Sequence, residues 1–165
     1  MALSKQDQRT FNIVVEEVVE HDPALIQAIV DIDLVTFSEV TWSRFTAGLM
    51  LRHGRTFLLR ADGTIIGTCQ LLKSWDDPQE AVLFSMSIRP GWRGRGLGTF
   101  FLQEVSTSLT ESGVASLVLE VDPKNEAAIR LYEEKFSFTR VALCTGEYGP
   151  GQDRLRMRRV LNASG

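Results

Sequence analysis

The stretch SIRPGWRGRGLGTFFLQEV, residues 87–105, places a glycine-rich turn between two segments with different patterns of apolar residues. The residues before the turn continue a run typical of a β-strand, whereas Leu97, Phe101 and Val105 recur at the spacing of one helix face. Within the turn, three glycines lie at alternate positions beside two arginines. The stretch therefore predicts a strand, a tight loop and a helix, in that order.

This loop has the chemistry of an anion-binding site. Glycine has no side chain, so a ligand can contact the backbone at Gly94, Gly96 and Gly98, which would build the first turn of the helix. The N–H groups and the dipole at a helix N-terminus favour negative charge, and Arg93 and Arg95 would add mobile positive charges. We expect the loop to hold a phosphate group such as a pyrophosphate. The alternative is a turn that requires glycine only for its backbone dihedral angles.

Two other phosphate-binding motifs match this loop less well. A Walker P-loop requires Lys followed by Ser or Thr after its last glycine, and this chain has Leu97-Gly98-Thr99. A dinucleotide-binding fingerprint requires G-x-G-x-x-G, whereas the glycines here follow G-x-G-x-G. Glu120 lies at a strand end where that fingerprint places its ribose-binding acid, so dinucleotide binding stays a weaker alternative.

The composition predicts one globular domain that comprises residues 1–165. With 44% hydrophobic and 24% charged residues, the chain can bury a sizeable core, and its net charge of −3 gives no support to nucleic-acid binding. Cys69 and Cys144 lie far apart and the chain has only two histidines, so the sequence predicts buried thiols and no metal site. It shows neither a signal-peptide run nor a membrane-spanning run, which predicts a soluble cytoplasmic protein.

The remaining segments predict a mixed α/β (α+β) architecture, a sheet flanked by helices. Asp22 and Pro23 suit the start of a helix, and Asp62-Gly63 is typical of a hairpin turn. Predicted strands cover residues 11–18, 56–74 as a hairpin, 81–88, 115–121, 138–144 and 153–161. Predicted helices cover residues 22–37, 41–52, 125–136 and the segment from Gly96 onward.

The loop and the segment after it resemble a known family. Arg93-Gly94-Arg95-Gly96-Leu97-Gly98 fits the R/Q-x-x-G-x-G/A signature of the GNAT superfamily of acetyl-CoA-dependent N-acetyltransferases, after a strand and proline, MSIRP. LVLEVDPKNEAAIRLYEEKFSF resembles the second half of that family, so the similarity covers residues 81–138. Within the superfamily, the chain most resembles the ribosomal-protein-alanine, or protein N-terminal, acetyltransferase branch. The resemblance implies a mixed, mostly antiparallel sheet of about seven strands flanked by about four helices.

The resemblance also implies roles for individual residues. It implies that acetyl-CoA is the cosubstrate, that Glu120 takes the amine proton directly or through water, and that Tyr132 acts as general acid near the sulfur. Asn125 would contact the pantetheine region. The thioester and pantetheine arm would meet backbone groups of Met86, Ser87 and Ile88, and the pyrophosphate would meet Arg93, Gly94, Arg95, Gly96, Leu97, Gly98 and Thr99.

Each of these residues also has a structural alternative. Tyr132 suits the core-facing side of an amphipathic helix, and Asn125 suits a helix N-cap. Glu120 suits a solvated strand end, with Asp122 and Glu80 as the other candidate bases. Trp42, Trp75 and Trp92 are expected to be packing residues, and the arginines of the last strand are expected to form a solvated face.

Two departures from the family pattern concern the acceptor and the cofactor turn. Ser137 stands where the family has glycine, which would alter a turn beside the cofactor. GEYGP supplies Tyr148 but places Glu147 where the protein N-terminal branch often has another tyrosine, and a carboxylate there would suit a cationic amine or a basic peptide.

The sequence therefore predicts transfer of an acetyl group from acetyl-CoA to a primary amine by direct attack in a ternary complex. The favoured acceptor is a peptide or protein N-terminus. The alternatives are a small amine, such as a polyamine or an antibiotic-like amine, and a non-catalytic module that senses acyl-CoA. The sequence predicts no nucleic-acid or membrane partner and leaves a homodimer open.

Overall fold

The computed structural model of the 165-residue chain describes residues 11–36 and 43–161. The chain divides into two compact units. Unit 1 comprises Met1–Leu72 and Ser85–Thr107, and unit 2 comprises Lys73–Phe84 and Ser108–Gly165. Two strands, β3 (Thr64–Lys73) and β4 (Glu80–Ile88), and one helix, α4 (Leu97–Glu111), contribute residues to both units.

The strands of the described residues form a seven-stranded sheet in the order β1-β2-β3-β4-β5-β7-β6. Neighbouring strands run antiparallel in β1–β2, β2–β3, β5–β7 and β6–β7, whereas β4 and β5 run parallel. Together with four α-helices in residues 11–36 and 43–161, this confirms the predicted mixed, mostly antiparallel architecture. None of the helices in these ranges is both long enough and apolar enough to cross a membrane.

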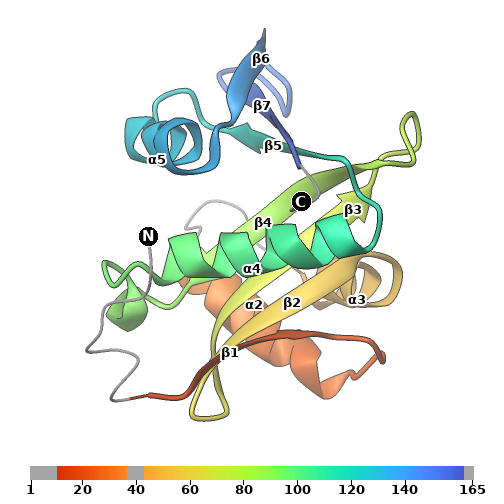
Figure 1. Ribbon diagram of the computed structural model, residues 1–165, viewed down its shortest axis with the longest axis vertical. Coiled ribbons are helices and arrows are strands. Elements are labelled where there is room, and N and C mark those ends of the chain that lie inside the picture. Colours follow the sequence, from red (N-terminus) through yellow and green to blue (C-terminus); the bar gives the residue numbers. More distant parts are fainter. Residues whose placement is uncertain (1–10, 37–42, 162–165) are drawn as a thin grey trace. The chain divides into compact units, whose positions relative to one another are not determined.

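Unit 1 contains the N-terminal strands and two helices that follow the first of them. Its elements are β1 (Ile13–Glu17), α2 (Ala24–Thr36), α3 (Arg44–His53), β2 (Arg55–Ala61) and β3 (Thr64–Lys73), whose last residue belongs to unit 2. The β2–β3 hairpin turns at Asp62 and Gly63, which have φ of 47° and 81°, as the sequence predicted. Figure 1 shows α4 on one face of β2 and β3, with α2 and α3 on the other.

The start of each N-terminal helix follows from local sequence. Asp22 Oδ1 accepts a hydrogen bond from the Ala24 N–H at 2.9 Å, and the Ser43 side chain accepts one from Thr46 at 3.0 Å. The apolar faces of α2 and α3 then form a core cluster of Ile29, Val30, Ala47, Met50 and Leu51. Trp42, expected to be a packing residue, lies outside the described residues.

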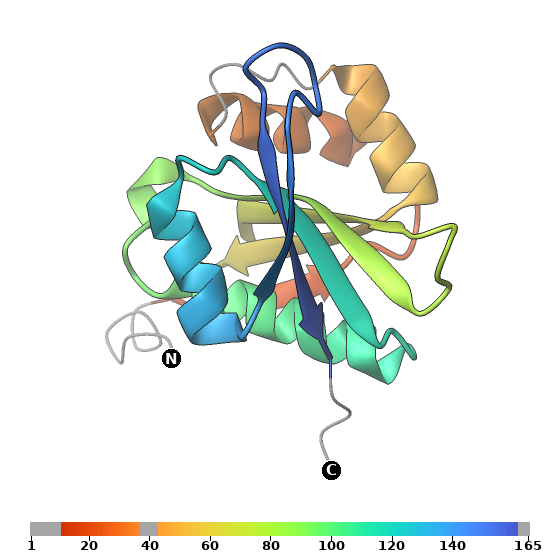
Figure 2. The same ribbon diagram turned by 90° about the horizontal axis from the view of Figure 1, so that it is seen from above.

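Unit 2 contains β5 (Ser116–Val121), α5 (Glu126–Phe136), β6 (Thr139–Cys144) and β7 (Arg154–Val160). Figure 2 shows these three strands and, at one end of them, the loop between β6 and β7. Leu155 and Met157 alternate with arginines along β7 and are buried. Ile129 and Phe136 of α5 are also buried.

Two predictions about single residues are wrong. Trp75, expected to pack in the interior, is 101% exposed in the segment between β3 and β4. Cys69 is buried as predicted, but Cys144 is only half-buried because it ends β6, whose other residues are all exposed.

Candidate active site

The glycine-rich loop of unit 1 begins with a short 3-10 helix, η1 (Pro90–Trp92), and ends where α4 starts at Leu97. Gly94 and Gly96 have φ of 76° and 78°, a left-handed conformation that glycine adopts without a steric penalty. The sequence placed three glycines in the first helical turn. The structure corrects this, because the first two precede the helix and only Gly98 lies within it.

The N-terminus of α4 presents several backbone donors. The intrahelical bond nearest this end runs from the Phe100 N–H to the Gly96 carbonyl at 3.0 Å, so the N–H groups of Leu97, Gly98 and Thr99 point out of the helix end. The first turn contains no acidic residue that would compete for them. Leu97 and Phe101 are almost fully buried and hold this end of the helix in place. The arrangement is one that can bind an anion.

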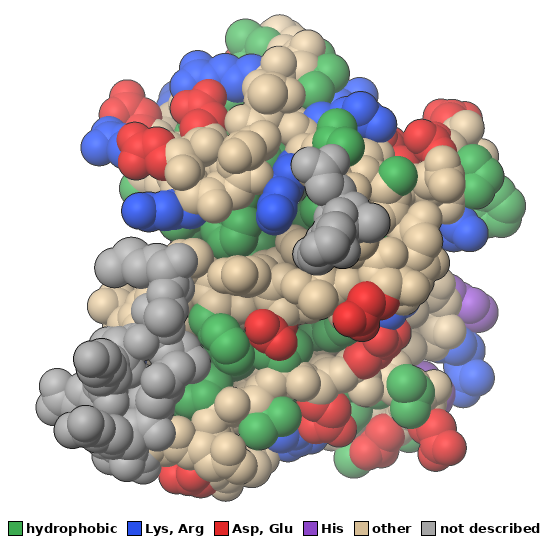
Figure 3. Space-filling model, in the orientation of Figure 1, with side chains coloured by type: hydrophobic (Ala, Val, Ile, Leu, Met, Phe, Trp, Pro, Cys, Tyr) green, Lys and Arg blue, Asp and Glu red, His purple; other side chains and the backbone are tan. Residues whose placement is uncertain are grey.

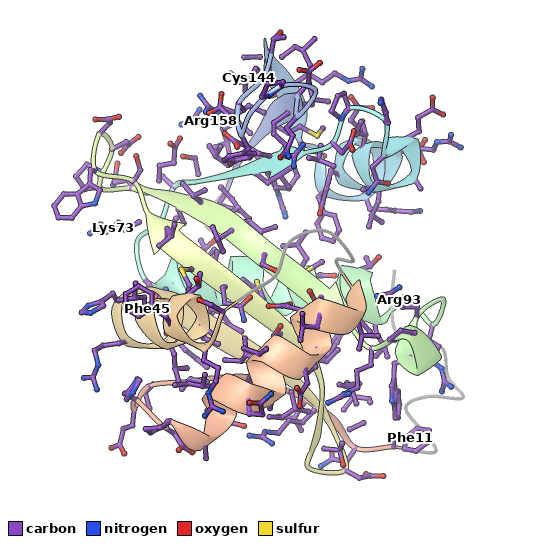
Figure 4. The ribbon with its side chains drawn as sticks, turned by 180° about the vertical axis from the view of Figure 1, so that it is seen from behind. Phe11, Phe45, Lys73, Arg93, Cys144 and Arg158 are labelled. Atoms are coloured by element: carbon purple, nitrogen blue, oxygen red, sulfur yellow. The ribbon has the colours of Figure 1, made fainter. Side chains whose placement is uncertain are left out.

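The two arginines of the loop donate hydrogen bonds to nearby backbone carbonyls. Arg93 Nε donates to the Ile88 carbonyl at 2.9 Å, and Figure 4 labels Arg93 beside the loop. Arg95 Nη2 donates to the Gly91 carbonyl at 3.3 Å, and its guanidinium lies 5.0 Å from the Trp92 ring centroid. Both cations therefore contact the backbone around the loop and place positive charge within it.

The end of β4 lies against this loop within unit 1. Besides the Arg93 bond to Ile88, a Cβ added to Gly98 would lie 3.7 Å from Ile88 Cδ1. The β4–β5 ladder pairs Glu80–Leu83 with Ser116–Leu119 and ends there, so Met86, Ser87 and Ile88 lie beyond it. Peptide groups beyond the ladder have no β5 partner in that ladder and can serve a ligand.

A buried carboxylate lies under β4, on the face opposite Ile88. Ser87 Oγ donates to Asp33 Oδ1 at 2.6 Å, and both residues are almost fully buried. Burial raises the pKa of Asp33 to about 6, and the hydrogen bond from Ser87 opposes part of the rise. Asp33 was not among the residues expected at the site. The available signal was its position four residues after Ile29 and next to Ile32, where the helix pattern requires a core residue.

In unit 2, Glu120 is the centre of a polar cluster. Arg156 lies directly opposite it on β7, and Arg156 Nη2 is 2.7 Å from Glu120 Oε1. The Tyr148 hydroxyl donates to Glu120 Oε2 at 2.5 Å. Burial alone would raise the pKa of Glu120, but the hydrogen bonds from Tyr148 and Arg156 outweigh it and lower the pKa. Glu120 is therefore a partnered carboxylate and not the solvated strand end that its position also allowed.

The arginines of β7 do not form a purely solvated face, as the sequence analysis expected. Arg158 Nε lies 3.1 Å from Glu80 Oε2, and Arg158 Nη2 donates to Ser116 Oγ at 3.0 Å. The Arg154 guanidinium lies 5.1 Å from the Tyr148 ring centroid. Because alternate residues of neighbouring strands share a face, these arginines meet the acids of β4 and β5. Glu80, a candidate base, is thus engaged with Arg158.

The two predicted site residues on and beside α5 also have structural partners. Asn125 is the N-cap, and its Oδ1 accepts from the Ala128 N–H at 3.2 Å. Tyr132 is half-buried, with its ring centroid 5.5 Å from that of Phe138. Ser137 caps the helix with φ of 56° and ψ of 33°, so serine adopts the left-handed conformation that favours glycine. Asp122, another candidate base, accepts the Lys124 N–H at 2.8 Å.

An open depression of about 570 Å³ surrounds the N-terminus of α5. It is lined by Lys124, Asn125, Glu126, Ala127 and Arg130. Figure 3 shows basic and acidic side chains close together over α5. Lys124 and Arg130 were not among the residues expected at the site, although two cations beside a helix N-terminus are a signal for a phosphate group.

The comparison with protein families supplies the deciding observation. The model described as "Acetyltransferase (GNAT) family" matches residues 23–138, which include the glycine-rich loop, Glu120 and Tyr132. The chain belongs to the GNAT acetyltransferase family.

Individual GNAT relatives agree with this assignment. The [ribosomal protein bS18]-alanine N-acetyltransferase of Escherichia coli K12 is 44% identical over 54 residues, which are 33% of this chain and 36% of the relative. The aligned part thus spans about a third of the curated relative's length. The solved structure of the E. coli ribosomal-protein-S18-alanine N-acetyltransferase has a TM-score of 0.74 at 24% identity and covers 93% of this chain and 97% of that chain. The Salmonella typhimurium protein yncA, solved with its cofactor acetyl-CoA, has a TM-score of 0.71 at 19% identity. The match covers 93% of this chain and 96% of that chain.

GNAT proteins use acetyl-CoA, and the loop of this chain fits the pyrophosphate of that molecule. Its donors converge on one helix end, no acid lies in the first turn, and two arginines place positive charge in the loop. Gly94–Thr99 and Met86–Ile88 belong to unit 1, whereas Glu120, Asn125 and Tyr132 belong to unit 2. Among the residues that the structure describes, no group of three His, Cys, Asp or Glu side chains could hold a metal ion.

Proposed function

We propose that this chain is an acetyl-CoA-dependent N-acetyltransferase that acts on the primary amine of a peptide or protein N-terminus, with residues 1–165 working as one domain. The observation that carries the proposal is the GNAT family match over residues 23–138, which contain a glycine-rich loop with anion-binding geometry. A cytoplasmic location and the oligomeric state stay predictions.

In this proposal, the loop binds the pyrophosphate of acetyl-CoA. Leu97, Gly98 and Thr99 donate their backbone N–H groups at the N-terminus of α4, where the helix dipole also favours the negative charge. The left-handed Gly94 and Gly96 turn the backbone toward that helix end without side chains in the way. Asn125 contacts the pantetheine region while it also caps α5.

Backbone groups of Met86, Ser87 and Ile88 bind the pantetheine arm and the thioester in the same proposal. These residues lie beyond the β4–β5 ladder, which leaves their β5-side peptide groups to a ligand. Acetyl-CoA supplies the activated acetyl group. A backbone N–H aimed at the thioester oxygen would stabilise the negative charge that develops there during attack.

Glu120 then removes the proton from the attacking amine, directly or through water. An amine is mostly protonated near neutral pH, so it must lose a proton before it attacks. Hydrogen bonds from Arg156 and Tyr148 lower the pKa of Glu120 and keep the carboxylate ionised, so it carries the negative charge that a proton acceptor requires. The hydrogen bond to Glu120, together with burial, raises the pKa of Tyr148 to about 12, so its phenol stays protonated and can donate.

Tyr132 acts as the general acid in this proposal. The departing thiolate gains from a phenol within hydrogen-bond reach, and the reaction requires no covalent intermediate on the enzyme. Packing against Phe138 restricts the Tyr132 ring, which would hold its hydroxyl in a fixed direction.

The acceptor class rests on the relatives' names. The E. coli relatives that align with this chain, or share its fold, are alanine N-acetyltransferases of a ribosomal protein. Their aligned part includes neither the whole of this chain nor the whole of theirs, so ribosomal protein bS18 itself is one candidate acceptor among peptide and protein N-termini.

The test is release of free thiol from acetyl-CoA with peptides that begin with alanine. We expect turnover with the free N-terminus and none with the same peptide acetylated at its N-terminus. A lysine-containing version of the blocked peptide controls for side-chain amines. Binding of acetyl-CoA without thiol release from any peptide or small amine would instead support the acyl-CoA sensor. Thermal stabilisation by NAD but not by acetyl-CoA would support dinucleotide binding.

A further inference from the structure

The polar cluster of unit 2 contains one cation that no carboxylate neutralises. The cluster consists of Glu120, Glu147, Tyr148, Arg154 and Arg156. Arg156 lies between the two acids, 2.7 Å from Glu120 Oε1 and 3.7 Å from Glu147 Oε1. Within residues 11–36 and 43–161, no carboxylate lies within ion-pair distance of Arg154.

Arg154 is held in a defined position even though it lacks an ionic partner. Its Nη1 donates to the Asp153 carbonyl at 2.8 Å, and its guanidinium lies over the Tyr148 ring at 5.1 Å from the centroid. These contacts restrict the side chain but use only one of its five N–H donors. An arginine whose guanidinium is held by stacking loses less conformational freedom when a carboxylate binds, so it is preorganised for that carboxylate.

The position of Arg154 relative to Glu120 is set by Tyr148. The Arg154 guanidinium stacks on the Tyr148 ring, and the Tyr148 hydroxyl donates to Glu120 Oε2 at 2.5 Å. The Arg154 charge also contributes to lowering the pKa of Glu120, which agrees with this proximity. A positive and a negative group thus lie about one tyrosine side chain apart on the same part of unit 2.

We propose that Arg154 is the acceptor-binding residue for a carboxylate, and that the acceptor is an amine with a carboxylate close to it. The proposal rests on the proposed function, in which Glu120 acts on the acceptor amine. In that function Glu120 takes the amine proton, and the Arg154 guanidinium binds the carboxylate through its remaining donors. An amino acid and a peptide with an acidic residue after its N-terminus both offer this chemistry.

This inference changes the acceptor preference that Glu147 suggested. An isolated carboxylate at that position would favour a basic acceptor, but Glu147 lies 3.7 Å from Arg156 and shares its charge with it. Arg154 keeps its full charge available. The cluster holds two carboxylates and two arginines, and among the described residues Arg154 is its arginine outside an ion pair. Because opposite charges across a binding surface select the partner, we expect Arg154 to favour an acceptor with a carboxylate over one without.

The test compares two peptides that begin with alanine and differ only in an aspartate or asparagine at the second position. Their affinities for the protein loaded with coenzyme A are measured by titration calorimetry, and free aspartate and alanine amide form a second pair. We expect the aspartate peptide to bind about tenfold more tightly than the asparagine peptide, since a charge-assisted hydrogen bond supplies about that factor. The preference should shrink as salt is added.

Arg154→Gln should abolish the preference, and Arg154→Lys should keep part of it because charge remains without the planar fork. Arg140→Gln is the matched control: it removes the same charge from β6 of unit 2, where Arg140 pairs with Glu133 at 2.6 Å, and should keep the preference. Unchanged coenzyme A affinity and circular dichroism establish that the variants are folded. A preference seen only with the peptide pair would identify a peptide as the source of the carboxylate. A preference seen only with free aspartate and alanine amide would identify an amino acid as its source.

Equal affinity for the two members of both pairs in the wild type would overturn the inference. A preference that survives in Arg154→Gln would overturn it as well. Thiol release is followed in parallel with the same acceptors. An Arg154-dependent preference in binding without thiol release would uphold this inference and contradict the proposed catalytic function, so the two failures are distinguishable.

Discussion

Asn in place of Asp33 should make the protein more stable near neutral pH. The native state raises the pKa of this buried carboxyl from 3.8 to about 6. The native state therefore binds the proton more tightly than the unfolded state, and stability falls as pH rises from about 4 to about 6. Because one pKa unit corresponds to about 1.4 kcal/mol, the ionised group costs up to about 3 kcal/mol above pH 6.

The substitution Asp33→Asn removes that charge but preserves most of the local hydrogen bonding. Asn Oδ1 can still accept from Ser87 Oγ, which now donates to Asp33 at 2.6 Å. Asp33 Oδ2 and Thr68 Oγ1 are buried without a hydrogen-bond partner, so the new amide would gain a donor where acceptors lie unpaired. We expect the free energy of unfolding at pH 7.5 to rise by up to about 3 kcal/mol.

The assay is urea unfolding followed by circular dichroism between pH 4.5 and 7.5. The wild type should lose stability across this range relative to Asp33→Asn. Asp31→Asn, an exposed position on the same helix whose Oδ1 accepts from Gln27, is the matched control and should follow the wild type. If Asp33→Asn is no more stable than the wild type at pH 7.5, relief of the buried charge is not the dominant effect and the reasoning fails.

Three further predictions concern the proposed reaction. Gly96→Val should raise the dissociation constant of acetyl-CoA about tenfold or more in calorimetry, because valine disfavours φ of 78°. Gly91→Ala is the control and should leave the dissociation constant unchanged, because an added Cβ at Gly91 meets nothing within 4 Å. Equal acetyl-CoA affinities in the two folded variants would contradict the loop assignment. Glu120→Gln should lower turnover on the order of a hundredfold near pH 7 and recover at alkaline pH as the amine loses its proton; an unchanged rate would transfer the role to ordered water. Tyr132→Phe should lower kcat and kcat/KM together by about tenfold with the acetyl-CoA affinity constant, and a loss of affinity at normal kcat would make Tyr132 a binding residue instead.

Much of the fold could be predicted from the sequence because its signals are local. Asp62-Gly63 marks the hairpin, and the spacing of Leu97, Phe101 and Val105 marks the helix after the loop. These features depend on backbone dihedral preferences and on helix or strand periodicity within a few residues. The family resemblance likewise depends on the short motif of Arg93 to Gly98.

The partners of the candidate catalytic residues depended on the tertiary structure. Sequence alone determined that an acid ends β5 and that arginines alternate along β7, but the strand register decides that Glu120 faces Arg156, 36 residues away. Ser87 and Asp33 are 54 residues apart, and packing of α2 beneath β4 brings them together. Pairings of this kind require long-range chain closure and a fixed register, which no local pattern specifies. The sequence therefore determined which groups the protein has for its chemistry, and the tertiary structure decided which charges those groups meet and how their pKa values shift.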